Sequence, residues 1–228
     1  MPQSFTGRLQ HLVFLLVLFV AALHSAWAAK PEQLPALNID VRETSISGLS
    51  SGAFMSVQFQ VVYSSIVKGA GIVAGGPYFC SQGSPLRATT QCSCTLDPAH
   101  DLCSVSSNSA KVSTLVSDTR QFAAQGLIED PANLTRQRVL IVAGEKDETV
   151  PPTVAAQLSE NYGQLAVPAA NKSEVHLINA AHTMPTVNYG KDCGVAEAND
   201  DGKCDYDTGK SILEWIYGPL EKPRQGET

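Results

Sequence analysis

The sequence predicts an α/β fold with a mostly parallel sheet, because candidate strands alternate with candidate helices along the chain. Two continuous apolar runs, AGIVAGG at 70–76 and RVLIVA at 138–143, are typical of buried strands. Segments with apolar residues at helical spacing separate these runs. Hydrophobic residues make up 43% of the chain and charged residues 17%, a balance that excludes general disorder.

The expected elements follow one another without an internal repeat. In chain order they are a strand at Glu43–Leu49, a helix carrying Phe54, Val57 and Val61, a strand at 70–76, a Cys-, Ser- and Thr-rich excursion at 80–104, a helix from Val112 to near Gly126, a strand at 138–143, a helix from Pro152 through Tyr162, a strand at 175–180, a polar loop at 191–209, and a helix carrying Ile212 and Ile216 that ends before Gly218. About four strands are therefore expected.

The charge of the chain argues against a nucleic-acid partner. Lys and Arg number 16 against 22 Asp and Glu, which gives a net charge of −6 over 228 residues. An acidic chain lacks the excess of cations that phosphate binding requires.

The amino terminus has the layout of a secretory signal peptide. Arg8 precedes the apolar run LVFLLVLFVAAL at 12–23, and small residues follow at Ala26 and Ala28. A bilayer span needs about 20 apolar residues, so this run is short for an anchor. We expect residues 1–28 to be removed, leaving a protein in the periplasm or the medium with no stable membrane anchor.

The cysteines are expected to form disulfides, because their number is even and the predicted compartment is oxidising. Cys193 and Cys204 lie far from the others in sequence and are expected to pair. The pairing of Cys80, Cys92, Cys94 and Cys103 is left open by the sequence. Cys92-Ser93-Cys94 lacks the usual spacing of zinc ligands, so no metal is expected.

A possible nucleophile lies where the first strand gives way to a helix. Gly48-Leu49-Ser50-Ser51-Gly52 has the G-x-S-x-G spacing of a nucleophile elbow, in which flanking glycines avoid side-chain clashes. Such a turn exposes the Ser50 hydroxyl above the sheet. The Ser51 backbone N–H, at the helix amino terminus, can donate to a developing oxyanion.

A serine nucleophile needs a base, and His182 is the best placed histidine. It comes just after an expected strand, in Ala181-His182-Thr183-Met184-Pro185, whereas His176 falls within that strand and His100 within the cysteine-rich excursion. The loop after a strand's carboxyl end is where α/β folds place such groups.

A carboxylate that fixes the imidazole tautomer completes the arrangement. Asp147 follows the strand RVLIVA, with Glu145 and Glu148 as rivals on the same turn. The order Ser50, Asp147, His182 is the order of the catalytic residues in α/β-hydrolases, and each residue follows a different expected strand.

These motifs resemble the secreted poly(3-hydroxybutyrate) depolymerases with a circularly permuted α/β-hydrolase fold. SISGLSSGAFMSVQFQVVYSS, GAGIVAGGPYFC, VLIVAGEKDETV, AAHTMPT and SILEWIYGPL carry the resemblance, which covers roughly residues 36–220. It implies that Ser50 is the nucleophile, Asp147 the orienting acid, His182 the base, and the Ser51 amide one oxyanion donor. The implied reaction is acyl-enzyme hydrolysis of a polyester, without a cofactor, in a catalytic domain at 29–228.

The resemblance also implies further strands after WIYGPL, together with a second oxyanion donor. The expected sheet is therefore incomplete, with an exposed edge that a second chain could complete. Loss of one oxyanion donor lowers rates by about 10²–10³-fold. The alternatives are an esterase for small or aromatic esters, or a noncatalytic secreted remnant or binding protein.

Overall fold

The computed structural model describes residues 35, 37–196 and 201–221. The signal peptide expected at 1–28 lies outside the described residues. The chain divides into two units, Met1–Ile39 and Asp40–Thr228. In the first unit the described residues, 35 and 37–39, form neither helix nor strand. The second unit contains the fold described below.

Four parallel strands form the central sheet, in the order β1-β2-β3-β4. They are β1 (Thr44–Leu49), β2 (Val67–Val73), β3 (Arg138–Gly144) and β4 (Lys172–Leu177). The register pairs Leu49 with Val73 and Val73 with Val142, and it pairs Gly144 with Leu177. The carboxyl ends of all four strands therefore lie at one edge, which confirms the predicted parallel α/β architecture.

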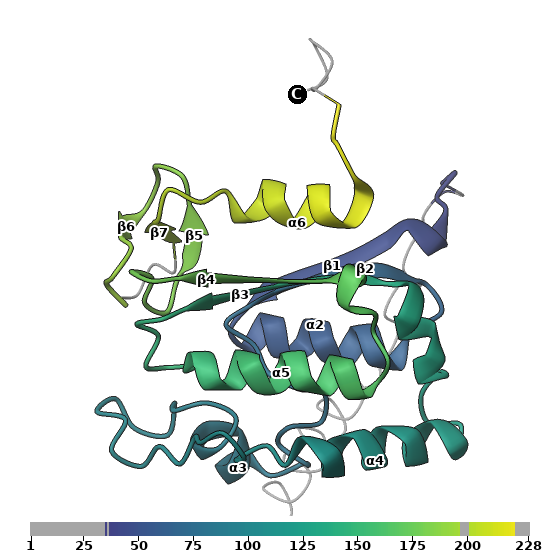
Figure 1. Ribbon diagram of the computed structural model, residues 1–228, viewed down its shortest axis with the longest axis horizontal. Helices are drawn as coiled ribbons and strands as arrows, with labels where there is room; N and C mark the ends of the chain where they lie inside the picture. Colours follow the sequence, from purple (N-terminus) through teal and green to yellow (C-terminus); the bar gives the residue numbers. More distant parts are fainter. Residues whose placement is uncertain (1–34, 36, 197–200, 222–228) are drawn as a thin grey trace, which may run out of the picture. The chain divides into compact units, whose positions relative to one another are not determined.

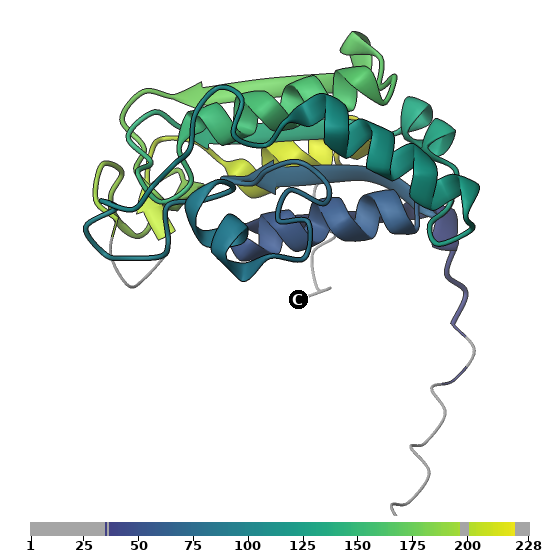
Figure 2. The same cartoon turned by 90° about the horizontal axis from the view of Figure 1, so that it is seen from below.

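Helices cover both faces of this sheet (Figure 1). The α-helices are α2 (Ser51–Val62), α3 (Pro85–Thr90), α4 (Val112–Ala124), α5 (Pro152–Gln164) and α6 (Thr208–Tyr217), and the 3-10 helices are η1 (Val41–Glu43), η2 (Pro131–Arg136) and η3 (Ala169–Asn171). The helices α2, α4 and α5 lie on one side of the sheet and α6 on the other (Figures 1 and 2). Of the helices in the described part of the chain, none is long and apolar enough to cross a bilayer.

Burial on both faces explains why β2 and β3 are continuous apolar runs. The larger core packs Val57, Ile141 and Leu158 between the sheet and the helices α2 and α5. A smaller core packs α6 on the opposite face. At Gly71 a Cβ atom would lie 2.5 Å from Ile212 Cδ1, so glycine in β2 allows the close approach of α6.

The structure corrects several expected boundaries. Both β2 and β4 begin three residues earlier than predicted, and residues 178–180 are a turn beyond the end of β4. The excursion at 80–104 contains α3. Two short strands occupy the expected polar loop, and with one preceding strand they form a second parallel sheet in the order β5-β7-β6. These strands are β5 (Met184–Thr186), β6 (Lys191–Asp192) and β7 (Asp201–Lys203).

All six cysteines are paired. The disulfides are Cys80–Cys92, Cys94–Cys103 and Cys193–Cys204, and the third is the pair that the sequence predicts. The structure thus resolves the pairing of the four clustered cysteines. Among the described residues no group of His, Cys, Asp and Glu is arranged to hold a metal ion.

A chain of hydrogen bonds runs through the main core. The Tyr162 hydroxyl donates to Gln60 Oε1 (2.5 Å), Gln60 Nε2 donates to Gln137 Oε1 (2.8 Å), and Gln137 Nε2 donates to the Ser64 carbonyl (2.8 Å). Burial raises the pKa of Tyr162, so its hydroxyl remains a protonated donor. The network satisfies polar side chains that the packing removes from water.

Replacing Tyr162 with Phe is expected to lower the free energy of unfolding by about 1–3 kcal/mol, because the buried Gln60 oxygen loses its donor. Tyr189→Phe is the matched control, since Tyr189 is 69% exposed. Urea unfolding followed by circular dichroism measures both variants. Equal midpoints for the two variants would contradict a stabilising role for the network.

Candidate active site

Ser50 occupies a strained turn between β1 and α2. Its backbone has φ 56° and ψ −122°, a conformation that residues other than glycine rarely adopt. Such a conformation costs about 1–3 kcal/mol and persists only when its surroundings impose it. Here the Ser50 N–H donates to the Val73 carbonyl (2.9 Å), and the Ser50 carbonyl accepts from Phe54 N–H (3.0 Å). Ser50 thus has the geometry of a nucleophile elbow.

The two glycines of the elbow motif are not equivalent. A Cβ atom on Gly48 would lie 2.4 Å from the Gly52 carbonyl carbon, so only glycine lets α2 approach β1 this closely. A Cβ atom on Gly52 would meet nothing within 4 Å. The expectation that both flanking glycines prevent clashes therefore holds for Gly48 and is wrong for Gly52.

Ser51 is the first residue of α2. The N–H groups in the first turn of a helix have no acceptor within the helix, and the helix dipole places partial positive charge there. This position fits the expected donation from the Ser51 amide to an oxyanion next to Ser50.

Asp147 is held at the turn after β3 with its carboxylate fully engaged. The residue is 4% exposed. One oxygen, Oδ1, accepts from the backbone N–H groups of Thr149 (2.9 Å) and Val150 (2.8 Å). The other, Oδ2, lies 2.8 Å from Nδ1 of His182. Two backbone donors thereby hold the carboxylate beside the imidazole ring.

The loops that carry Asp147 and His182 are fastened to each other. A Cβ atom on Gly144 would lie 2.4 Å from the Ala180 carbonyl oxygen, so this contact requires glycine. The Lys146 N–H donates to the same Ala180 oxygen (2.9 Å). On the other side, the Ala181 N–H donates to the Cys193 carbonyl (2.8 Å), which belongs to a disulfide. His182 therefore follows a backbone segment that is anchored at two successive residues.

The rival acidic and histidine side chains lie elsewhere. His176 Nδ1 lies 2.7 Å from Glu145 Oε1 in an exposed pair. His100 Nδ1 lies 2.5 Å from the Cys94 carbonyl. Glu148 is exposed. Of the three acidic residues on the turn, the structure pairs Asp147 with His182.

Ser50 and the Asp147–His182 pair lie at the same edge of the sheet. Among the described residues no hydrogen bond joins the Ser50 hydroxyl to His182, and catalytic hydrogen bonds often tighten only when substrate binds. Ser50 nevertheless lies near the Asp147–His182 pair. Ser50 and Val150 line one cavity, and the Val150 N–H donates to Asp147 Oδ1. Leu49 also packs against the apolar cluster that contains Val150.

The sequence analysis missed two structures that surround these residues. One is α3, whose signal was the Ser84-Pro85 pair: Ser84 Oγ caps the helix by accepting from Arg87 N–H (3.2 Å). The other is the β5-β7-β6 sheet next to His182, whose strands have only two or three residues each. Such short strands show no measurable periodicity.

Comparison with known proteins identifies relatives of one kind. A poly(3-hydroxybutyrate) depolymerase of Delftia acidovorans is 40% identical over 202 residues, which cover 88% of this chain and 37% of that protein. A polyhydroxybutyrate depolymerase of Talaromyces funiculosus is 31% identical over 214 residues, covering 92% of this chain and 58% of that protein. No family model matches the chain.

Solved structures agree with the sequence relatives. The crystal structure of PHB depolymerase from Penicillium funiculosum matches with a TM-score of 0.71 and 31% identity, over 85% of this chain and 57% of that one. A PHB depolymerase complexed with an R3HB trimer gives the same values. These matches confirm the resemblance to the depolymerases and the α/β-hydrolase-like fold. The chain spans 37% and 58% of the length of the two curated relatives.

The two elbow glycines provide a matched test of the local geometry. Gly48→Ala is expected to lower the free energy of unfolding by about 1–3 kcal/mol, because its Cβ would meet the backbone of α2. Gly52→Ala is expected to be neutral or stabilising by up to about 1 kcal/mol, since alanine favours the helix and has room there. Thermal unfolding of both variants measures the difference. Equal destabilisation by the two substitutions would contradict this account of the elbow.

Proposed function

We propose that this chain, a relative of the poly(3-hydroxybutyrate) depolymerases, is a serine esterase in which Ser50 is the nucleophile, His182 the base and Asp147 the orienting acid. The observation that carries the proposal is the strained Ser50 turn at the edge of the sheet where Asp147 holds His182 at 2.8 Å. Buried carboxylate, anchored imidazole and elbow serine are the three parts that acyl transfer needs.

In the first half of the proposed reaction, the Ser50 hydroxyl oxygen attacks the ester carbonyl carbon. His182 Nε2 accepts the hydroxyl proton, while Asp147 stabilises the imidazolium through Nδ1. The negative charge that develops on the carbonyl oxygen is stabilised by the Ser51 N–H. The ester carbon–oxygen bond then breaks, and the imidazolium gives its proton to the departing alcohol.

In the second half, water releases the acyl group from Ser50. His182 takes a proton from the water, the hydroxide attacks the acyl carbon, and Ser50 recovers its proton as the acid leaves. Each step transfers protons between groups of this chain, the substrate and water. The chemistry therefore requires no metal or cofactor.

The proposed substrate is a polyester of short hydroxy acids, of the poly(3-hydroxybutyrate) type. This choice rests on the names of the relatives and on the R3HB trimer bound by a structurally similar depolymerase. The proposed location is outside the cytoplasm, because three disulfides are most stable in an oxidising compartment. The second candidate in this class, hydrolysis of small or aromatic esters, uses the same three residues and differs only in the ester presented.

Ser50→Ala is expected to abolish both ester hydrolysis and labelling by a serine-reactive phosphonate, because it removes the attacking oxygen. Ser47→Ala is the control, an exposed serine on β1 three residues away. Mass spectrometry of the labelled protein locates the adduct, and turnover of a soluble nitrophenyl ester is compared with clearance of a polymer film. An adduct or hydrolysis that persists in Ser50→Ala would refute the assignment.

Asp147→Asn is expected to lower kcat by about 10⁴-fold while leaving the fold intact, because an amide no longer fixes the productive imidazole tautomer. Glu148→Gln removes a charge from the same turn at an exposed position and is expected to change kcat by less than about twofold. Steady-state kinetics on a soluble ester compares the two. Similar kcat values in both variants would contradict the proposed orienting role of Asp147.

A further inference from the structure

A disulfide joins two strands of the second sheet. The register pairs Asp192 of β6 with Lys203 of β7, so the residues that follow them, Cys193 and Cys204, lie side by side at the carboxyl ends of these strands. Their Cα atoms are 4.8 Å apart and their sulfur atoms are bonded. The disulfide therefore connects β6 to β7 directly after their last paired residues.

Both cysteines also bond to the backbone of the segment that carries His182. The Cys193 carbonyl accepts from Ala181 N–H (2.8 Å), one residue before the histidine. The Cys204 N–H donates to the Thr186 carbonyl (2.9 Å), at the end of β5. One covalent bond thus links backbone contacts on either side of His182 in the chain.

The strand β7 packs against the residue that follows His182. A Cβ atom on Gly202 would lie 2.6 Å from Thr183 Cγ2, so glycine is required for this approach. Thr183 is 4% exposed, and β5, which begins at the next residue, pairs with β7. The His182 ring lies with Nδ1 2.8 Å from Asp147 Oδ2. The position of this ring therefore depends on the position of β7.

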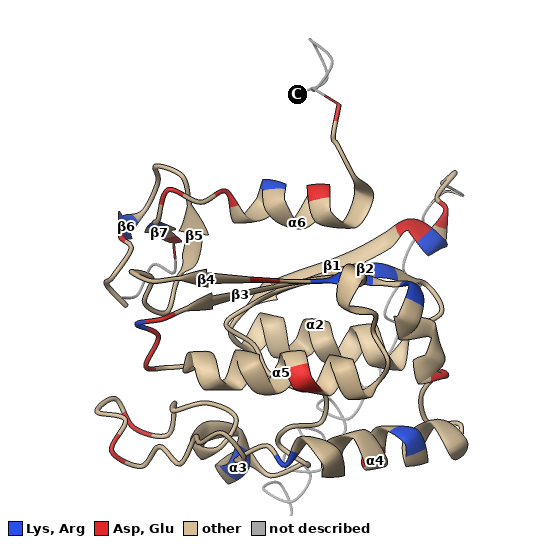
Figure 3. Cartoon of the chain, in the orientation of Figure 1, with Lys and Arg blue, Asp and Glu red and all other residues tan. Residues whose placement is uncertain are grey.

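The strands β6 and β7 have little apolar surface with which to hold themselves in place. They are Lys191-Asp192 and Asp201-Gly202-Lys203, so four of their five residues are charged (Figure 3). Sheets with so few residues are marginally stable by themselves. The covalent link keeps β6 beside β7 where a short ladder of hydrogen bonds would not.

We propose that the Cys193–Cys204 disulfide is a positioning element for the base: it holds β7 against the segment that carries His182 and so keeps the imidazole on Asp147. The inference rests on the proposed esterase function and deepens it. The two cysteines act through His182 and not on the ester itself. A misplacement of about 1 Å can lower a rate by about 10²-fold, so loosening this segment slows attack by Ser50 without removing a reacting group.

The double substitution Cys193→Ser/Cys204→Ser is expected to lower kcat on a soluble nitrophenyl ester at least about tenfold and to leave KM within about threefold. Tyr162→Phe is the control for lost stability, because it weakens a core hydrogen bond away from the site; its kcat is expected to stay within about twofold. Circular dichroism verifies that both variants are folded. Unchanged kcat in the folded double variant would overturn the proposal.

Gly202→Ala tests the same contact with the disulfide intact, and it replaces the double variant if that one does not fold. Its Cβ would meet Thr183, so kcat is expected to fall at least about tenfold with KM within about threefold. Lys203→Ala, at the next and exposed position of β7, is the matched control and is expected to keep kcat within about twofold. Equal kcat in the two variants would overturn the role of β7.

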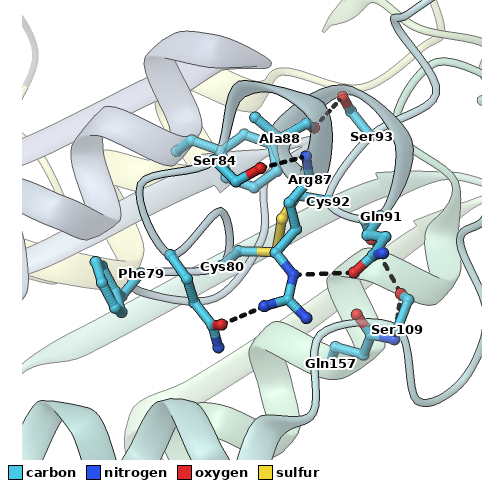
Figure 4. The surroundings of a disulfide bond; sticks show 12 residues. Phe79, Cys80, Ser84, Arg87, Ala88, Gln91, Cys92, Ser93, Ser109 and Gln157 are labelled. Carbon is cyan, nitrogen blue, oxygen red and sulfur yellow. Dashed lines mark hydrogen bonds between the residues drawn. A yellow bond between two sulfur atoms is a disulfide. The ribbon is translucent and has the colours of Figure 1, made fainter.

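Reduction of wild-type protein gives a reversible test. Cys193 and Cys204 are half-buried, whereas Cys80 and Cys92 are each 3% exposed and lie among side chains of the segment that contains α3 (Figure 4). A small dithiol, itself oxidised to a cyclic disulfide, is therefore expected to reduce Cys193–Cys204 first and leave two thiols. Alkylation and peptide mass spectrometry identify the reduced pair. Esterase activity is expected to fall with this labelling and to return when an unalkylated sample is reoxidised; full activity with both cysteines labelled would overturn the proposal.

The hydrogen bond between His182 and Asp147 gives a readout that needs no turnover. The proton on His182 Nδ1 is expected to give a strongly downfield ¹H NMR signal, assigned by its absence in Asp147→Asn and lost or broadened in the double variant. An unchanged signal in the double variant would overturn the proposal. If wild-type protein hydrolyses esters and the double variant does so equally well, the positioning role fails and the esterase function stands. If wild-type protein neither hydrolyses esters nor reacts with phosphonate, the esterase function fails, and the NMR signal still decides whether the disulfide holds the imidazole.

Discussion

The contact between the ends of β3 and β4 is the constraint on which the rest of the site depends. Gly144 lies so close to the Ala180 carbonyl that a Cβ atom would be only 2.4 Å from the oxygen, and this approach sets Asp147 against His182. The parallel register pairs the ends of β1, β2 and β3, so Ser50, which follows β1, lies at the same edge. A shift of one residue in any of these pairings would turn the strand's side chains to the opposite face and separate the groups.

The position of Asp147 at a strand end could be predicted because β3 carries a strong signal, whereas β1 and β4, which precede Ser50 and His182, are only partly buried. The G-x-S-x-G spacing located Ser50, and the loop after the expected strand at 175–180 located His182. Buried parallel strands are continuous apolar runs, and the polar residue that follows such a run must lie at the carboxyl edge. The helix α3 and the small second sheet, which lie around the site, have weaker sequence signals. The six residues of α3 are too few for a helical period, and the strands β5 to β7 have two or three residues each. Disulfide pairing within 80–103 depends on the path of the chain through space, which local pattern does not specify.

The strain and buried polarity of this fold are compensated by specific contacts. The Ser50 backbone is held in an unfavourable conformation by one hydrogen bond from β2 and one within α2. The buried Asp147 carboxylate accepts three hydrogen bonds, so its desolvation is offset where the imidazole needs a fixed partner. Core glutamines distant from the site are satisfied by each other and by Tyr162. The strained Ser50 conformation can thus persist because the surrounding residues are held by hydrogen bonds.

The turn after β3 and the cavity beside Ser50 differ in their charged groups. Glu145, Lys146 and Glu148 are exposed on the turn that carries Asp147, and Figure 3 shows both acidic and basic residues in this turn after β3. No charged side chain lines the cavity beside Ser50, and Ser51, the first residue of α2, is part of that lining. In the proposed reaction the substrate is neutral and the product is an anion. The negative charge that develops on the ester oxygen in that reaction would lie beside the amino terminus of α2, whose first N–H groups have no acceptor within the helix and carry partial positive charge.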